Sequence, residues 1–82
     1  MDPDVAKLIL LGPAHDSAGR REDEFDGATL DDVLKESILR YGDGFGALLA
    51  TCQVWVNGEQ VARTTPLHPH DEIMVLPPVS GG

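Results

Sequence analysis

The residues that could do chemistry stand at the end of the sequence, which reads PPVSGG over residues 77–82. The two final glycines have no side chain to bury in a core, and they lose the most backbone freedom when they are ordered. Such an end is better suited to entering a narrow active site of another protein than to packing. The reactive group would be the C-terminal carboxylate of Gly82, which is an anion at neutral pH.

A carboxylate of this kind could attack the α-phosphate of ATP and form an acyl adenylate, which has a good leaving group. The sequence has no glycine-rich phosphate-binding loop, so a partner enzyme must bind the ATP and its metal. We therefore expect no cofactor bound to this chain. We also expect no metal site, because His68 and His70 lie in a loop with only Asp71 nearby and are more typical of solvated side chains than of ligands.

The residues before Gly82 are expected to bind in the partner's channel. They are Pro77, Pro78, Val79, Ser80 and Gly81. The prolines would hold the base of this tail extended, and six extended residues reach at most about 20 Å. Ordering four flexible residues costs on the order of 4 to 8 kcal/mol. The folded part of the chain must therefore contribute a docking surface.

The composition indicates one small globular domain, predicted over residues 1–76, followed by a flexible tail over residues 77–82. The chain has 82 residues, of which 41% are hydrophobic, and its 14 acidic and 6 basic residues give a net charge of −8. This charge disfavours nucleic acid and anionic membranes and favours partners with basic surfaces. Because the sequence shows neither a signal peptide nor a membrane-spanning segment, and has a single cysteine, we expect a cytoplasmic protein.

The first half of the chain predicts two strands and a helix. The aliphatic run over residues 5–11 indicates a strand, residues 12–23 a polar turn, and the stretch ending at Phe25 a second strand. Acidic residues 22–26 are expected to be solvated and could also steer a basic partner. The clearest helix covers residues 27–42, with Thr29 as its cap and Gly42 as its stop.

The second half predicts three further strands. A short helical turn over residues 43–51 precedes Asn57-Gly58, a strong hairpin signal, which places strands at residues 53–57 and 60–63. A last strand over residues 73–76 leads into the tail. The predicted class is α+β, with one main helix lying across a mixed sheet of four or five strands.

Strand alternation predicts a docking patch on the sheet face away from that helix. If Val54, Val56, Ile73 and Val75 face the helix, their neighbours face outward, and polar Lys7 implies the same for the odd residues of the first strand. The predicted patch consists of Ile9, Leu11, Trp55, Met74 and Leu76. An exposed apolar patch of this kind would mark a protein interface.

Several motifs resemble the ubiquitin-like sulfur carriers of the MoaD/ThiS family, and most closely the small subunit of molybdopterin synthase. They are AGRRE, ATLDDVL, VNGE and DEIMVLPPVSGG, and the resemblance extends from Lys7 to the end. Three features depart from the family pattern: AHDS at residues 14–17, His70 where a glycine is usual, and Trp55. The resemblance implies a β-grasp fold and a thiocarboxylate formed at Gly82.

The resemblance also implies partners. An E1-like adenylyltransferase/sulfurtransferase would activate Gly82, and the large subunit of molybdopterin synthase, or another sulfur-accepting enzyme, would receive the sulfur. The chain itself is expected to be a non-catalytic subunit and not an enzyme. Alternative destinations of the sulfur are cysteine, thiamine, thiolated tRNA nucleosides and secondary metabolites. A protein modifier conjugated through Gly82 is a further alternative, whereas the single Cys52 excludes an iron–sulfur electron carrier.

Overall fold

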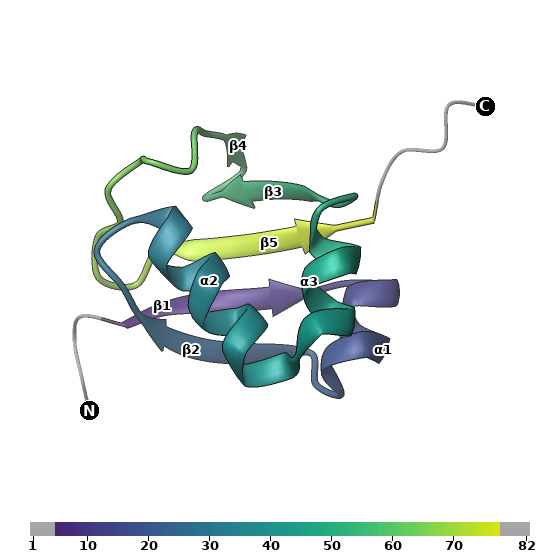
Figure 1. Ribbon diagram of the computed structural model, residues 1–82. Helices are drawn as coiled ribbons and strands as arrows, with labels where there is room; N and C mark the ends of the chain where they lie inside the picture. Colours follow the sequence, from purple (N-terminus) through teal and green to yellow (C-terminus); the bar gives the residue numbers. More distant parts are fainter. Residues whose placement is uncertain (1–4, 78–82) are drawn as a thin grey trace.

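The computed structural model describes residues 5–77, which form one mixed sheet and three helices (Figure 1). The strands are β1 (Val5–Leu10), β2 (Glu22–Asp26), β3 (Gln53–Val56), β4 (Glu59–Gln60) and β5 (Glu72–Leu76). The helices are α1 (Pro13–Ala18), α2 (Leu30–Tyr41) and α3 (Asp43–Leu49). The predicted α+β class, with five strands and α2 across the sheet, is confirmed.

The strand order in the sheet is β2-β1-β5-β3-β4. The two central strands, β1 and β5, are parallel, and the other neighbouring pairs are antiparallel. Inward-facing side chains of the central strands pack against the helices, and Ile73 and Val75 are fully buried. The rest of the core is formed by Ala6, Leu8, Leu10, Ala14, Phe25, Leu30, Val33, Leu34, Phe45, Leu49 and Val56.

Helix α2 begins and ends as the sequence predicts. The Thr29 side chain accepts a hydrogen bond from the Asp32 N–H at 3.3 Å, and the Asp32 carboxylate accepts one from the Thr29 N–H at 3.2 Å. This reciprocal capping box satisfies two N–H groups that a helix start would otherwise leave unpaired. The Gly42 N–H donates to the Ile38 carbonyl at 2.8 Å, and the chain then enters α3.

The polar turn predicted over residues 12–23 is wrong in its first half, because α1 forms there. Pro13 occupies the first turn, where its missing N–H costs nothing, and Gly19 caps the end in the left-handed conformation at φ 78°. Ala14 is buried at 1% exposure and attaches the helix to the core. Apart from Pro13, the apolar residues of α1 are alanines, so hydrophobic periodicity gives little signal.

The predicted hairpin is confirmed, although its second strand is shorter than expected. Asn57 and Gly58 both have positive φ, 51° and 85°, as the tight turn requires. Strand β4 ends at Gln60 because the chain then crosses the start of α2. There the carbonyls of Arg63 and Thr65 accept the first N–H groups of that helix at 2.8 and 3.0 Å.

Candidate functional site

The candidate site begins where β5 leaves the sheet. Leu76 ends the strand and is half-buried, and Pro77 follows as an exposed residue. The predicted reactive Gly82 and the tail residues Pro78, Val79, Ser80 and Gly81 lie outside the described residues. The structure therefore defines the base from which this tail starts.

The base of the tail lies beside the turn that joins β1 to α1. Because β1 and β5 are parallel neighbours, their C-terminal ends meet at the same edge of the sheet, which α1 and α3 flank (Figure 1). The Leu11 N–H donates to the Val75 carbonyl at 3.2 Å, one residue beyond the strand pairing. At Gly12, a Cβ would lie 3.6 Å from Cγ of Pro77, so the proline ring faces this turn.

The five residues of the predicted docking patch lie on one face of the sheet. Ile9 is opposite Met74 in the β1–β5 pairing, and Trp55 is opposite Met74 in the β3–β5 pairing, so these three side chains form a row across the central strands. Leu11 and Leu76 continue the patch toward the tail. All five are half-buried, whereas their neighbours Leu8, Ile73 and Val75 are fully buried on the helix side. We call this set the open-face patch.

Acidic side chains border the open-face patch along β2 and at the start of β5. Lys7 is opposite Glu24 in the pairing with β2 and opposite Glu72 in the pairing with β5, and its Nζ lies 4.0 Å from Glu22. The three glutamates are exposed. One lysine thus stands among three carboxylates, and the apolar patch has an acidic border.

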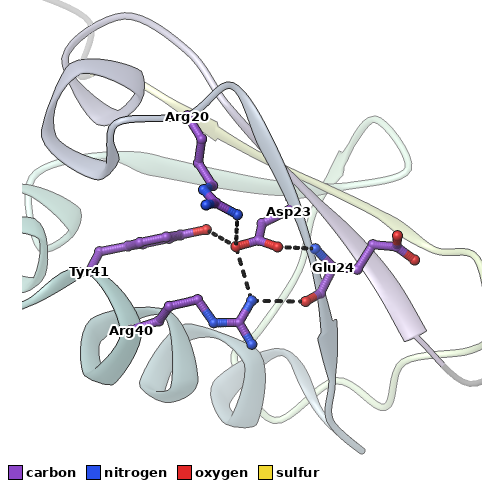
Figure 2. Close-up of polar contacts among 5 residues, drawn as sticks. All are labelled: Arg20, Asp23, Glu24, Arg40 and Tyr41. Carbon is purple, nitrogen blue, oxygen red and sulfur yellow. Dashed lines mark hydrogen bonds and ion pairs between the residues drawn. The ribbon is translucent and has the colours of Figure 1, made fainter.

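Asp23 belongs to a polar cluster that joins β2 to α2 (Figure 2). Its Oδ2 accepts a hydrogen bond from the Tyr41 hydroxyl at 2.7 Å and pairs with Nη1 of Arg40 at 2.9 Å and Nη1 of Arg20 at 3.1 Å. The Asp23 side chain is only 14% exposed. The prediction that residues 22–26 are all solvated is therefore wrong at Asp23, because its long-range partners cannot be seen in local sequence.

The cluster shifts the pKa of both central groups. Burial opposes ionisation of Asp23, but the hydrogen bonds from Tyr41, Arg40 and the Glu24 N–H and the charge of Arg40 outweigh it, so the net pKa is lowered. The pKa of Tyr41 is raised well above its ordinary value by burial and by the Asp23 carboxylate. These groups stabilise the packing of α2 on the sheet.

The loop histidines and Cys52 form no recognisable site. His68 and His70 are exposed, and among residues 5–77 no group of three or more His, Cys, Asp or Glu side chains is arranged to hold a metal ion. Cys52 is half-buried at a hollow of about 420 Å³ between α2 and β3. No helix in the described part of the chain is long and apolar enough to cross a membrane.

Comparison with known families identifies the group of proteins to which this chain belongs. Residues 8–82, which include the whole tail, match the model of the ThiS family. The chain belongs to the ThiS family. The predicted resemblance to ubiquitin-like sulfur carriers with a β-grasp fold is thereby confirmed. No curated protein matches the sequence.

Solved structures support this assignment. A Pyrococcus furiosus protein described as molybdopterin converting factor subunit 1 has 26% identity and a TM-score of 0.83, with coverage of 92% of this chain and 98% of its own. Small archaeal modifier protein 1 from Methanosarcina acetivorans has 25% identity and a TM-score of 0.85, with coverage of 95% and 96%. A complex of subunits 1 and 2 of molybdopterin-converting factor from Helicobacter pylori includes a chain with 25% identity, a TM-score of 0.69 and coverage of 95% and 99%.

Proposed function

We propose that this chain is a sulfur carrier for molybdopterin in molybdenum cofactor biosynthesis, acting in the cytoplasm. The observation that carries the proposal is the ThiS family match, which extends through Gly82 and so includes the tail. The likeness to molybdopterin converting factor subunit 1 supports molybdopterin as the destination of the sulfur. The chain would be a non-catalytic small subunit, because partners consume and regenerate its reactive group.

The proposed chemistry takes place at the C-terminal carbonyl carbon. The Gly82 carboxylate attacks the α-phosphorus of ATP, and pyrophosphate leaves, giving an acyl adenylate. A persulfide on the activating enzyme then attacks the carbonyl carbon and displaces AMP. A thiol finally cleaves the resulting acyl disulfide, which leaves a thiocarboxylate on Gly82 and a disulfide on the enzyme. This chain supplies only the carbonyl group, and an E1-like adenylyltransferase/sulfurtransferase supplies the nucleotide site and the persulfide.

Docking energy would come from the open-face patch. Its row of half-buried apolar side chains lies at the tail end of the sheet, so a partner bound there would have the tail base at its edge. The acidic border favours a partner with basic residues beside an apolar surface, since complementary charge accelerates encounter. The Helicobacter pylori complex supports binding to a second subunit.

Intact mass spectrometry tests the proposed chemistry. After incubation with an activating enzyme, ATP and a persulfide donor, the chain should gain about 16 Da, because sulfur replaces one oxygen. Deletion of Gly82 should abolish this gain. The deletion should leave the melting temperature nearly unchanged, since the described core lies within residues 5–77. A parent chain that never gains this mass would contradict the proposal.

Alanine variants inside and outside the open-face patch test the docking surface. Leu11→Ala and Trp55→Ala should weaken the complex with the large subunit, measured by titration calorimetry, by about tenfold or more each. Leu39→Ala is the matched control, because Leu39 is 80% exposed on α2 and lies outside the patch. Circular dichroism should show that all three variants remain folded. Equal affinities for the Leu11 and Leu39 variants would place the interface elsewhere.

A second candidate function is protein modification through the same residue. The likeness to small archaeal modifier protein 1 favours it, because an activated Gly82 could equally be transferred to a lysine amine. In cells, this function would appear as a ladder of isopeptide-linked target proteins that depends on Gly82. Delivery of the sulfur to cysteine, thiamine, tRNA or a secondary metabolite would instead be revealed by the acceptor that restores the thiocarboxylate to a carboxylate.

A further inference from the structure

We propose that the turn at Gly12 is a positioning element for the tail: the ring of Pro77 faces it, and this proximity sets the direction in which the chain leaves the sheet. Gly12 would then be a positioning residue for the chemistry at Gly82, seventy residues away in sequence. The inference rests on the proposed function, since direction matters only if the tail must enter a partner's site.

The proximity of Gly12 and Pro77 follows from the parallel pairing of β1 and β5. Parallel neighbours deliver their chains to the same sheet edge, so the segment after β1 and the segment after β5 lie side by side. The two paths then diverge, because β1 turns into α1 at Gly12 while β5 continues into Pro77. A Cβ on Gly12 would lie 3.6 Å from Cγ, 3.8 Å from Cβ and 3.8 Å from Cδ of Pro77, so one side of the ring faces the turn.

The backbone of the turn explains why residue 12 is a glycine. Gly12 has φ 60° and ψ −132°, a combination that residues with a side chain rarely adopt. The absent side chain also leaves open the space beside the Pro77 ring. A Cβ alone would fit beside the ring at an ordinary van der Waals distance, so a side chain that extends beyond Cβ is needed to displace it.

The turn is fixed on both sides and can therefore act as a support. Before it, the Leu11 N–H is bonded to the Val75 carbonyl at 3.2 Å, which links the turn to β5 itself. After it, the Gly12 carbonyl accepts the Asp16 N–H at 3.3 Å, and Ala14 is buried in the core. The ring of Pro77 already fixes its φ, and a rigid turn beside it further limits the directions that the chain can take. The tail therefore loses less conformational entropy when a partner binds it.

A pair of glycine variants separates positioning from backbone strain. Gly12 and Gly19 flank the same helix and both have positive φ, so Gly12→Val and Gly19→Val both introduce strain. A Cβ at Gly19 meets nothing within 4 Å, whereas one at Gly12 meets Pro77. In the free parent protein, nuclear Overhauser effects should connect the Gly12 Hα atoms with the Pro77 ring protons. The Pro77 ring signals should shift in the Gly12 variant and stay unchanged in the Gly19 variant.

The functional readout is the kcat/KM for thiocarboxylate formation, measured where circular dichroism shows each variant fully folded. We expect a fall of about tenfold for Gly12→Val and less than about twofold for Gly19→Val, because misplacement of a reacting group by about 1 Å is enough to slow a reaction strongly. If Gly12→Val does not fold, Pro77→Ala is compared with Pro78→Ala. The first removes the ring that faces Gly12, and it should lower kcat/KM further than the second.

The outcomes distinguish this inference from the proposed function. A parent chain that gains no sulfur would overturn the proposed function and, with it, this inference. A parent that reacts normally, with equal kcat/KM for the two glycine variants or for the two proline variants, would overturn the positioning role alone. Absence of the Gly12–Pro77 Overhauser effects in the parent would overturn it as well.

Discussion

Tyr41→Phe is a sharp test of how α2 is held on the sheet. The substitution removes the hydroxyl that donates to Asp23 at 2.7 Å. It keeps the aromatic ring, whose centroid lies 6.1 Å from that of Phe25 and 5.0 Å from that of Phe45 in edge-on geometry. A hydrogen bond to a charged group contributes about 1.5 to 3 kcal/mol. We expect a loss of about 1.5 kcal/mol, at the lower end of that range, because Arg40 and Arg20 still pair with Asp23.

Thermal unfolding followed by circular dichroism measures this loss. For a domain of this size, about 1.5 kcal/mol corresponds to a fall in melting temperature of roughly 6 to 12 °C. Urea unfolding should show a lower midpoint with an unchanged slope, because the surface exposed on unfolding hardly changes.

The difference between parent and variant should also depend on pH. The pKa of Asp23 is lowered in the folded state, so its ionised form adds stability that is fully present above about pH 4 and is lost as the pH falls through the folded pKa. A protonated Asp23 accepts the tyrosine hydrogen bond more weakly. The stability difference should therefore shrink as the pH falls below about 4. A difference below about 0.5 kcal/mol at neutral pH, or one that is the same at every pH, would refute the reasoning.

Three further outcomes are expected. Tyr41 is the only tyrosine, so at about pH 11 its ultraviolet absorbance should show less ionisation in the folded protein than in the unfolded chain. Stability should fall as the pH rises above about 10, where the unfolded chain releases this proton. Asn57→Ala should lower the free energy of unfolding, measured in urea, by about 2 kcal/mol. The Asn57 side-chain NH₂ donates to Asp71 at 2.9 Å, and its side-chain carbonyl accepts the Glu72 N–H at 2.9 Å. Asn57 also has a φ of 51°, which alanine adopts less readily than asparagine. His70→Gly should raise the free energy of unfolding by about 0.5 kcal/mol and the melting temperature by a few degrees, because His70 has φ 69° and glycine adopts positive φ without strain. A lower melting temperature would contradict this account.

The sheet and α2 could be predicted because their signals are local. Alternation along β1 and β5 placed Lys7 and Met74 outward, and the structure has them there. The capping pattern at Thr29 set the start of α2. His70 stands where the family usually has a glycine, and its positive φ is the physical reason why a glycine is favoured at that position.

The remaining features depend on contacts between distant segments. Helix α1 is short and is held by Ala14, whose single methyl group contributes little to any hydrophobic pattern. In the sequence, nothing distinguishes Asp23 from the acidic residues around it. Its partners Tyr41 and Arg40 lie far along the chain and meet it only in the folded structure. The proximity of Gly12 and Pro77 requires the parallel pairing of the first and last strands, which no local motif specifies.

The central position of β5 links the completion of folding to display of the chain end. This strand joins the β1–β2 pair to the β3–β4 pair, and it is the last of the described strands to leave the ribosome during synthesis. Before it is made, the two halves of the sheet have no shared neighbour. A nascent or truncated chain that lacks residues 72–76 therefore has neither a continuous five-stranded sheet nor a complete open-face patch. A partner that docks on this patch would consequently discriminate against unfinished molecules before any ATP is spent on them.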